Sequence, residues 1–525
     1  MSTYDYVVIG AGSAGCAVAA RLAASGEYEV AVVEAGPPDD LPEIAVPAAF
    51  PSLFKGSVDW NYTTEPQKNL NARSDYWPRG KVYGGSSSLN AQIYQRGAHA
   101  DYDGWAALGN DGWSFADMLP LFKRAQHQER GESEYHGVGG PINVTDLRDP
   151  NPLSRAFVAA AVEQGHPAND DFNAATQAGF GLYQVTQKEG TRWSAARGYL
   201  HPALDLPNFT VIAPAMVTRL TFDGARCTGC VYDGAVGEQQ ITARREVVVS
   251  GGAVNSPQLL MLSGVGPREQ LESLGIPVRR DLPGVGENLQ DHLAVPVAYT
   301  CTAPITLTGA CDPEQGARFL DAKMGLLTSN IGESGGFLTV GESAAPDLQF
   351  HFVPGWFVDH GFRNPASGHG FTALPGLVGT RSVGRMWLRS ADPQDKPALD
   401  PNYLGDDRDM QVLVDGIRIV RDIIASPAFD GYRGAEHLPG DAVRSDDDLR
   451  EFVRNYVQGL YHPVGTCAMG VDERAVVDPQ LRVRGLEGLR VADASIMPVI
   501  VNANTNNPSI VIGEKCAEMI LNAGG

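Results

Sequence analysis

The sequence has no long apolar run, few cysteines and a shortage of positive charge. A membrane-spanning helix needs about 20 consecutive apolar residues, and no run reaches that length. The 7 cysteines are scattered and odd in number, so they do not form a disulfide framework. Lysine and arginine total 41 against 62 aspartates and glutamates, a formal net charge of −21. We therefore expect no nucleic-acid partner, which would call for a basic surface, and no membrane partner.

The chain also lacks the features of a processed or repetitive protein. Its first apolar run begins almost at the N-terminus, which leaves no room for the charged and apolar regions of a signal peptide, and we expect a cytoplasmic protein. Internal repeats and low-complexity tracts are absent from the sequence. A length of 525 residues predicts two domains, or one domain with large insertions. We expect a monomer or a homodimer.

A single CxxC pattern, Cys227 to Cys230, has no second pair and no histidine at metal-ligand spacing. It lies between segments that read as strands joined by turns, residues 217–220 and 231–232. A structural position is therefore favoured over redox or metal chemistry, and no metal site is expected.

The first 36 residues predict a strand, a glycine turn, a helix and a second strand. Residues 6–9 form a β-branched apolar run that ends in GxGxxG, residues 10–15. Gly10 permits a tight turn, Gly12 lets a pyrophosphate approach the backbone, and Gly15 lets the following helix pack on the strand. Free N–H groups and the helix dipole favour an anion at that helix start. This pattern predicts a dinucleotide site.

The second strand, residues 30–33, ends in Glu34, a carboxylate suited to a ribose diol. Glu34 disfavours a 2′-phosphate, so NADP is not expected, but the motif does not separate FAD from NAD.

Further along, residues 79–90 form a dense glycine and serine run that offers many backbone N–H groups and little bulk. The alternatives for this run are a flexible linker and an ordered loop against a flat ligand, and its flanking apolar residues favour the loop.

These motifs together resemble the glucose-methanol-choline (GMC) oxidoreductases, flavoproteins that oxidise alcohols, and the resemblance covers nearly the whole chain. It rests on residues 10–15 with 34–36, 80–90, 251–266, 284–292, 462–466 and 491–495. The fold implied is α/β, a Rossmann-like FAD-binding domain with an α+β substrate-binding cap built on an antiparallel sheet. The FAD-binding domain would comprise residues 1–149, 197–293 and 459–525, and the cap residues 150–196 and 294–458.

Local patterns in the cap agree with that implication. Phe350, Phe352 and residues 386–388 read as short strands, and residues 407–425 show the apolar spacing of an amphipathic helix. Ser445 with Asp448 resembles a capping box with aspartate in place of glutamate.

The resemblance also implies the cofactor contacts. The glycine and serine loop would lie along the isoalloxazine ring and pyrophosphate, Val217 would meet the adenine, and Asp493 and Ala494 would return to the pyrophosphate. Some choline oxidases carry a histidine in this loop that bonds covalently to the flavin, and this chain has Leu89 there, so non-covalent FAD is expected. The expected contacts are Gly10, Gly12, Ser13, Ala14, Gly15, Glu34, Ala35, Val82, Gly85, Ser86, Asn90, Ala91, Val217, Asp493, Ala494 and Thr505.

Two residues are expected to act on the alcohol. His462 stands where the family places its active-site histidine, in an HPxGT motif. The second polar partner, histidine or asparagine in the family, aligns with Asn504, with Asn506 as the alternative. A hydride leaves an alcohol carbon for flavin N5 only as the hydroxyl proton departs, and a histidine near neutral pKa can accept that proton. His462 is either this base or a hydrogen-bond partner, and Asn504 would orient the oxygen.

Substrate choice lies in the cap, where the sequence is least informative. Tyr461 is expected to wall the pocket, and Phe337, Phe352, Trp356 and Phe357 are candidates that could equally belong to the core. An aromatic or aliphatic primary alcohol is the favoured substrate. Glu333 could face a cation such as choline, but a solvated or structurally paired carboxylate is the better interpretation.

Three activities fit the resemblance. The first is an alcohol oxidase that makes an aldehyde and returns electrons to oxygen as hydrogen peroxide. The second is a dehydrogenase, including one like choline dehydrogenase, that passes electrons to a quinone or other acceptor. The third is a lyase in which the flavin is structural.

Overall fold

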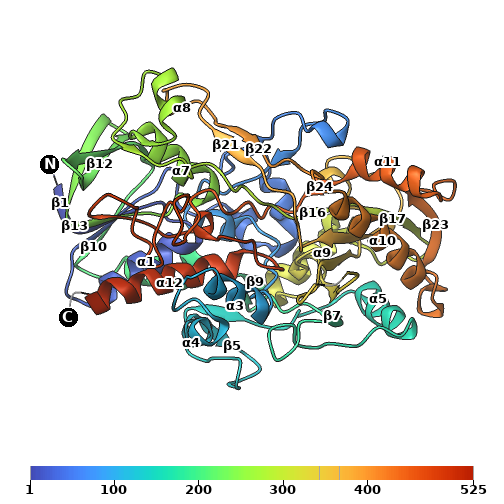
Figure 1. Ribbon diagram of the computed structural model, residues 1–525. Coiled ribbons are helices and arrows are strands. Elements are labelled where there is room, and N and C mark those ends of the chain that lie inside the picture. Colours follow the sequence, from blue (N-terminus) through green and yellow to red (C-terminus); the bar gives the residue numbers. More distant parts are fainter. Residues whose placement is uncertain (1, 342, 366, 524–525) are drawn as a thin grey trace.

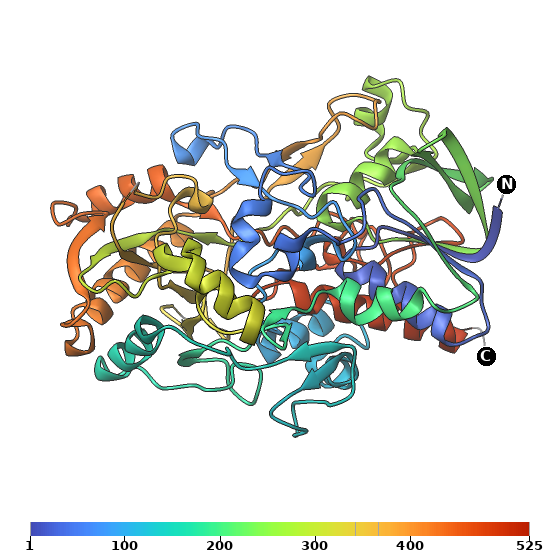
Figure 2. The ribbon, with the colours of Figure 1, turned by 180° about the vertical axis from the view of Figure 1, so that it is seen from behind.

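The computed structural model describes residues 2–341, 343–365 and 367–523, and it has the expected α/β architecture (Figure 1). Two large sheets form the frame. One is mostly parallel and carries the N-terminal strand, and the other is antiparallel and lies toward helices α10 and α11 (Figure 1). Figure 2 shows the same two regions from behind.

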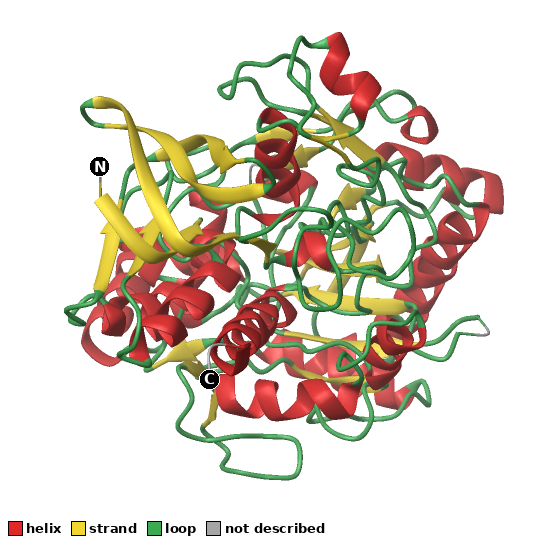
Figure 3. Ribbon diagram, turned by 60° about the vertical axis from the view of Figure 1, so that its left-hand side comes forward, coloured by secondary structure: helices red, strands yellow, loops and turns green. Residues whose placement is uncertain are grey.

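The first sheet has the order β10-β2-β1-β13-β12-β11, with β25 paired to β13. Five of these strands run parallel, and β11 and β12 extend the sheet as antiparallel strands. Figure 3 shows this twisted sheet near the N-terminus. Their bounds are β1 Ser2–Ile9, β2 Val30–Val33, β10 Phe209–Ile212, β11 Met216–Asp223, β12 Arg226–Gly234, β13 Gly237–Val249 and β25 Leu489–Val491.

The carboxyl ends of β1, β2 and β13 meet at one edge because Ile9 pairs with both Val33 and Val249. Ligands of parallel α/β sheets bind outside this edge. Gly10, Glu34 and Ser250 follow these three strands directly, so the fold delivers the glycine turn and the acid to the same place.

Helix α1 (Ser13–Ala24) follows the glycine turn and packs beside α12 (Asn506–Ala523), as Figure 1 shows. A side chain at Gly15 would place its Cβ 1.9 Å from the Gly10 carbonyl oxygen. The third glycine of the motif therefore permits the close packing of helix on strand that the sequence predicted.

The second sheet has the order β23-β17-β20-β19-β18-β7, with β16 and β24 attached, and its pairings are antiparallel. Helices α5 (Pro152–Glu163) and α10 (Asp407–Ile424) pack on it. The strands are β7 Gly179–Leu182, β16 Leu293–Ala294, β17 Val297–Cys301, β18 Ser334–Leu338, β19 Leu348–Val353, β20 Gly370–Leu377, β23 Arg433–Leu438 and β24 Gln458–Gly459.

Two local predictions in this region are confirmed. The amphipathic helix expected over residues 407–425 is α10, which buries Leu413, Ile417 and Val420. The capping box at Ser445 opens α11 (Asp446–Tyr456), where the Asp448 N–H donates to Ser445 Oγ at 3.2 Å.

The structure has further α-helices and short strands outside these two sheets. They are α2 Pro42–Ala45, α3 His99–Ala107, α4 Phe115–Ala125, α6 His201–Ala203, α7 Gly252–Leu262, α8 Arg268–Ser273, α9 Pro313–Ala322, β3 Tyr62–Thr63, β4 Tyr76–Trp77, β5 Gln126–Gln128, β6 Ile142–Val144, β8 Gln187–Lys188, β9 Thr191–Arg192, β14 Val265–Gly266, β15 Arg280–Asp281, β21 Arg385–Trp387 and β22 Ala398–Asp400.

The division into domains stays a proposal. The strands of the parallel sheet fall within residues 1–149, 197–293 and 459–525, and those of the antiparallel sheet fall almost wholly within 150–196 and 294–458. We retain the division on that ground.

The described residues contain neither a membrane-spanning helix nor a cluster of metal-ligating side chains. Across 2–341, 343–365 and 367–523, no helix combines the length and apolarity needed to span a bilayer. Over the same ranges, no three histidine, cysteine or acidic side chains gather at metal-binding distance. Cys227 and Cys230 both lie buried on β12 as free thiols.

Candidate active site

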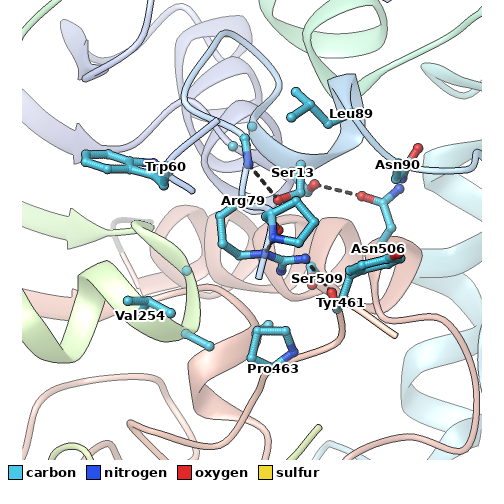
Figure 4. A pocket seen from close by; sticks show the side chains of 18 of the residues that line it. Ser13, Trp60, Arg79, Leu89, Asn90, Val254, Tyr461, Pro463, Asn506 and Ser509 are labelled. Atoms are coloured by element: carbon cyan, nitrogen blue, oxygen red, sulfur yellow. Dashed lines mark hydrogen bonds between the residues drawn. The ribbon is translucent and has the colours of Figure 1, made fainter. Parts of the chain in front are cut away.

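A large cavity opens at the carboxyl edge of the parallel sheet and reaches the antiparallel sheet. Its lining joins residues that follow β1, β2 and β13 to His351 and Val353 of β19 and Leu374 of β20. Figure 4 shows part of it, with Ser13, Arg79, Asn90 and Tyr461 around the same space. The cavity therefore has a dinucleotide end, built from the glycine motif, and a cap end, built from the second sheet.

At the dinucleotide end, glycine backbone forms part of the cavity wall, and we call this region the cradle. Gly12 and Gly85 face each other, and a Cβ on Gly85, whose φ is +52°, would lie 2.7 Å from Gly12 Cα. Gly12, Ser13 and Ala14 line the cavity at the start of α1, where free N–H groups and the helix dipole favour an anion.

Glu34 lines the same end and is held by backbone donors. The Ala11 N–H donates to Oε2 and the Gly36 N–H donates to Oε1, each at 2.7 Å. Burial raises the pKa of Glu34 to about 7, and these two hydrogen bonds act in the opposite direction. A carboxylate oxygen accepts two hydrogen bonds, so each oxygen retains capacity for a ribose hydroxyl.

The glycine and serine loop is ordered against the cavity. Ser86, Leu89, Asn90 and Ala91 line it, and Arg192 Nη1 donates to Asn90 Oδ1 at 2.9 Å. Arg192 also binds the carbonyls of Ile44 and Ser87 and is fully buried, which lowers its pKa to about 9. Arg192 lies outside every motif of the sequence, and it fixes the loop through these three hydrogen bonds.

Val82 is the expected cofactor residue of this loop that the cavity lining does not include. Its side chain is fully buried in a separate apolar cluster with Ile44, Leu53, Val58 and Leu89. Its β-branched side chain anchors the loop from behind instead.

Other expected cofactor residues lie on the cavity wall. Val217 lines it with Ala215 and Met216, and Ala35, Ala494 and Thr505 do so as well. Gly10 also lines it, whereas Gly15 lies behind in the packing of α1. Asp493 lines the cavity as well, and its carboxylate accepts from Gly252 N and Ser256 Oγ at Oδ2 and from Ser495 N at Oδ1.

His462 and Asn504 meet where the two ends of the cavity join. Asn504 Nδ2 lies 3.2 Å from His462 Nε2, and both residues line the cavity. His462 is 8% exposed, and burial, assisted by the nearby His292, His351 and Arg79, holds its pKa well below the usual value of 6.5. The imidazole is therefore neutral at pH 7 and able to accept a proton.

Asn506, the alternative to Asn504, points elsewhere. Its Oδ1 accepts from Ser13 Oγ at 2.7 Å, which ties the start of α12 to the start of α1 (Figure 4). The geometry therefore pairs Asn504 with the histidine and leaves Asn506 at the dinucleotide end.

The backbone holds His462 from behind. Its N–H donates to Asp291 Oδ1 at 2.7 Å, and Arg79 Nη2 donates to the Tyr461 carbonyl. Tyr461 has a φ of +69°, an uncommon conformation for a residue with a side chain, and it turns the chain so that adjacent side chains line the cavity.

Two histidines without an assigned role stand beside His462. His292 Nδ1 lies 3.0 Å from His462 Nδ1, and burial lowers the pKa of His292 to about 3. His351 lines the cavity from β19, and burial lowers its pKa to about 4. His292 belongs to one of the family motifs, but it lies 170 residues from His462 in sequence, so no local pattern indicates their contact.

Three of the candidate cap aromatics do not line the cavity. Phe352 is fully buried on the far side of β19, stacked on Phe157, because neighbouring residues of a strand face opposite sides and His351 and Val353 face the cavity. Phe337 packs in a separate cluster with Phe172. Trp356 lies against Gly370 and His437.

Tyr461 and Phe357 do line the cavity. With them stand apolar side chains that give the cap end its character: Phe50, Phe54, Ile93, Ile331, Val353, Leu374 and Leu460.

Glu333 has a structural position. Its carboxylate accepts from Ser329 Oγ, Ser154 Oγ and Asn151 N at 2.6 to 2.7 Å, and it is not part of the cavity lining. The paired interpretation is therefore the one that the structure supports.

Comparison with known proteins matches the chain to the family model described as GMC oxidoreductase, over residues 4–294 and 380–513. The chain is 45% identical to an alcohol dehydrogenase [acceptor] of Pseudomonas putida, covering 99% of this chain and 96% of that protein. It is 44% identical to the mitochondrial choline dehydrogenase of Homo sapiens, covering 98% and 89%. A formate oxidase from Aspergillus oryzae RIB40, studied for its FAD modification, superposes with a TM-score of 0.94 at 29% identity, covering 99% and 98%.

Proposed function

The chain belongs to the GMC oxidoreductase family, and from this premise we propose that it binds FAD and oxidises an uncharged primary alcohol to an aldehyde. The observation that carries the proposal is the His462–Asn504 pair, which stands where a dinucleotide cradle meets an apolar pocket. A proton acceptor and a hydrogen-bond donor beside one another suit a hydroxyl group, which gives a proton and accepts a hydrogen bond.

The residues of the cradle fit FAD. Gly12 and Gly85 present backbone where a Cβ would collide, the start of α1 suits the pyrophosphate, and Glu34 suits the ribose. When bound, FAD would supply the hydride acceptor for the alcohol carbon. Leu89 offers no nucleophile for a bond to the flavin, so we propose that the cofactor is held without one.

His462 and Asn504 would act on the two sides of the hydroxyl oxygen. The Nε2 of neutral His462 accepts the hydroxyl proton as the carbon gives up its hydride. Asn504 Nδ2–H donates to the same oxygen and stabilises its developing negative charge without titrating. The buried wall around the pair excludes water and strengthens both interactions.

The lining of the cap end supports an uncharged substrate. The carboxylates of the lining, Glu34 and Asp493, both lie at the dinucleotide end. Beside His462 the lining offers Arg79, whose positive charge lowers the histidine's pKa and would oppose a cationic substrate. Aromatic and aliphatic walls favour an alkanol or an aryl-methanol over choline.

We propose that the electrons pass to an acceptor other than oxygen, because the relative at 45% identity is named for such an acceptor. Oxygen, the acceptor favoured by the sequence analysis, is the second candidate, and it is supported by the likeness to a formate oxidase.

The test is flavin absorbance of purified protein mixed without oxygen with benzyl alcohol, a linear alkanol and choline. We expect the first two to bleach the flavin and choline to leave it oxidised. Slow recovery in air and fast recovery with a quinone would support the acceptor-dependent dehydrogenase, and rapid recovery with peroxide would establish the oxidase. The His462→Ala variant should bleach slower by about 10²- to 10⁴-fold while FAD stays bound. Absence of bleaching with every alcohol would refute the proposal and favour a lyase.

A further inference from the structure

A line of buried polar side chains runs from the antiparallel sheet to the proposed base. Gln349 Nε2 donates to Asn504 Oδ1 at 2.9 Å, Asn504 Nδ2 faces His462 Nε2 at 3.2 Å, and His462 Nδ1 faces His292 Nδ1 at 3.0 Å. At the outer end, Gln349 Nε2 lies 3.5 Å from the Tyr183 hydroxyl. Each contact in the line is a hydrogen bond with one donor and one acceptor, so its direction from donor to acceptor can be assigned.

We propose that Tyr183, Gln349 and His292 are positioning residues that hold His462 in the tautomer with its proton on Nδ1. Nε2 is then the unprotonated nitrogen, and it can accept the alcohol proton. The inference rests on the proposed function of His462 as a base, and it names the residues that prepare the histidine for that role.

The Tyr183 hydroxyl fixes the donor and acceptor roles at the outer end of the line. Its hydroxyl donates its single hydrogen to the Phe350 carbonyl at 2.6 Å, because a carbonyl oxygen is only an acceptor. Burial raises the pKa of Tyr183, so the hydroxyl keeps this hydrogen. The hydroxyl oxygen therefore presents lone pairs to Gln349. The Gln349 amide must turn its NH₂ group toward it, since a carbonyl oxygen there would face lone pairs.

The orientation of Gln349 in turn fixes the amide orientation of Asn504 and the tautomer of His462. The same NH₂ group of Gln349 donates to Asn504, so the Asn504 amide presents its oxygen to Gln349 and its NH₂ to His462. A donor facing Nε2 requires that nitrogen to be the acceptor. The proton of neutral His462 is therefore on Nδ1.

His292 completes the line. Two imidazole nitrogens 3.0 Å apart share one hydrogen, and with the His462 proton on Nδ1, His292 Nδ1 must accept. The two ring planes meet at 85° with their centroids 5.1 Å apart. With Nδ1 as the acceptor, the proton of the neutral His292 ring is on Nε2.

The first measurement is the tautomer of His462 in the holoprotein. Protein labelled with ¹⁵N-histidine is examined by long-range ¹H–¹⁵N correlation, and the His462 ring, one of 11, is assigned by its absence in His462→Gln. We expect a pyridine-type signal for Nε2 and a pyrrole-type signal for Nδ1. The opposite pattern in the wild type would overturn the inference.

A matched pair of variants then tests His292. His292→Asn retains an acceptor oxygen close to the position of Nδ1, and His292→Leu fills the space without one. We expect the leucine variant to lose the wild-type tautomer and about 10- to 100-fold in kcat, because a buried N–H loses its acceptor, with little change in KM. The asparagine variant should keep the tautomer and most of the rate. Equal losses in both, or no loss in the leucine variant, would refute a positioning role.

Tyr183→Phe tests the outer end and removes a single oxygen. It frees the Gln349 amide to turn, so we expect a mixture of His462 tautomers and a fall in kcat of about fivefold to tenfold. An unchanged wild-type tautomer would exclude Tyr183 from the line. The tautomer is measured whether or not any alcohol bleaches the flavin, so failure of this inference is distinguishable from failure of the proposed function.

Discussion

Replacement of Asn504 by alanine is the substitution that separates the two asparagines proposed from the sequence. The variant removes the Nδ2–H that lies 3.2 Å from His462 Nε2, the donor expected to bind the alcohol oxygen. Loss of one donor to a developing oxyanion typically lowers kcat by about 10² to 10³, or roughly 2.7 to 4 kcal/mol. We expect that loss in the rate of anaerobic flavin bleaching by alcohol, with FAD still bound.

The same substitution also leaves Gln349 Nε2 without its acceptor at 2.9 Å. An unsatisfied buried donor costs about 1 to 3 kcal/mol of stability, so thermal unfolding should be measured beside the rate. The matched control is Asn506→Ala, which breaks the bond with Ser13 Oγ at 2.7 Å. We expect this control to release FAD more readily and to change the bleaching rate of the FAD-bound fraction by less than about tenfold. Equal rate losses in the two variants would refute the assignment of Asn504.

Three further predictions address the cradle, the pH dependence of stability and substrate choice. Gly85→Ala should lower the FAD content of purified protein severalfold, because its Cβ would lie 2.7 Å from Gly12 Cα, whereas Gly104→Ala, with open space around it, should retain FAD; equal contents would contradict this. The pKa of His351, about 4 when folded against about 6.5 unfolded, gives stability that is complete above pH 6.5 and is lost as pH falls toward 4. Between about pH 5 and 6, the free energy of unfolding should therefore rise by about 1 kcal/mol less in His351→Gln than in the wild type. Urea titrations at the two pH values measure this rise, and an equal rise in both proteins would contradict the prediction. Phe357→Ala should enlarge the apolar wall and shift the ratio of kcat/KM toward longer alkanols by about tenfold, measured across a series of chain lengths, and an unchanged ratio would place this ring outside the substrate site.

The dinucleotide end was predictable because its signals are local. A buried strand, a glycine turn and an acid after the next strand lie within 36 residues, and parallel pairing alone brings Gly10 and Glu34 to one edge. His462 and Asn504 came from family motifs, and the structure brings them together. The pairing of His462 with His292 was not predictable from local patterns, because it joins residues 170 positions apart.

The expected lining of the cap end differs from the structure for a reason that the sequence itself contains. Phe352 was proposed for the substrate pocket, yet strand periodicity separates it from its neighbours His351 and Val353. One face of β19 had to enter the core, and Phe352, stacked on Phe157, lies on that face. Recognition that residues 348–353 form one strand would have predicted two alternating sets, although not which set faces the cavity.

The same alternation links β19 to the proposed positioning of His462. Gln349 shares the parity of His351 and Val353, so the strand face that walls the cap end also presents the amide that orients Asn504. His462 and Asn504 come from segments outside the antiparallel sheet, whereas Gln349 and Tyr183 belong to it or follow its strands. Under this proposal, the tautomer of His462 depends on how the antiparallel sheet packs against the parallel sheet. A substitution that shifts β19 should alter the His462 tautomer without touching the histidine.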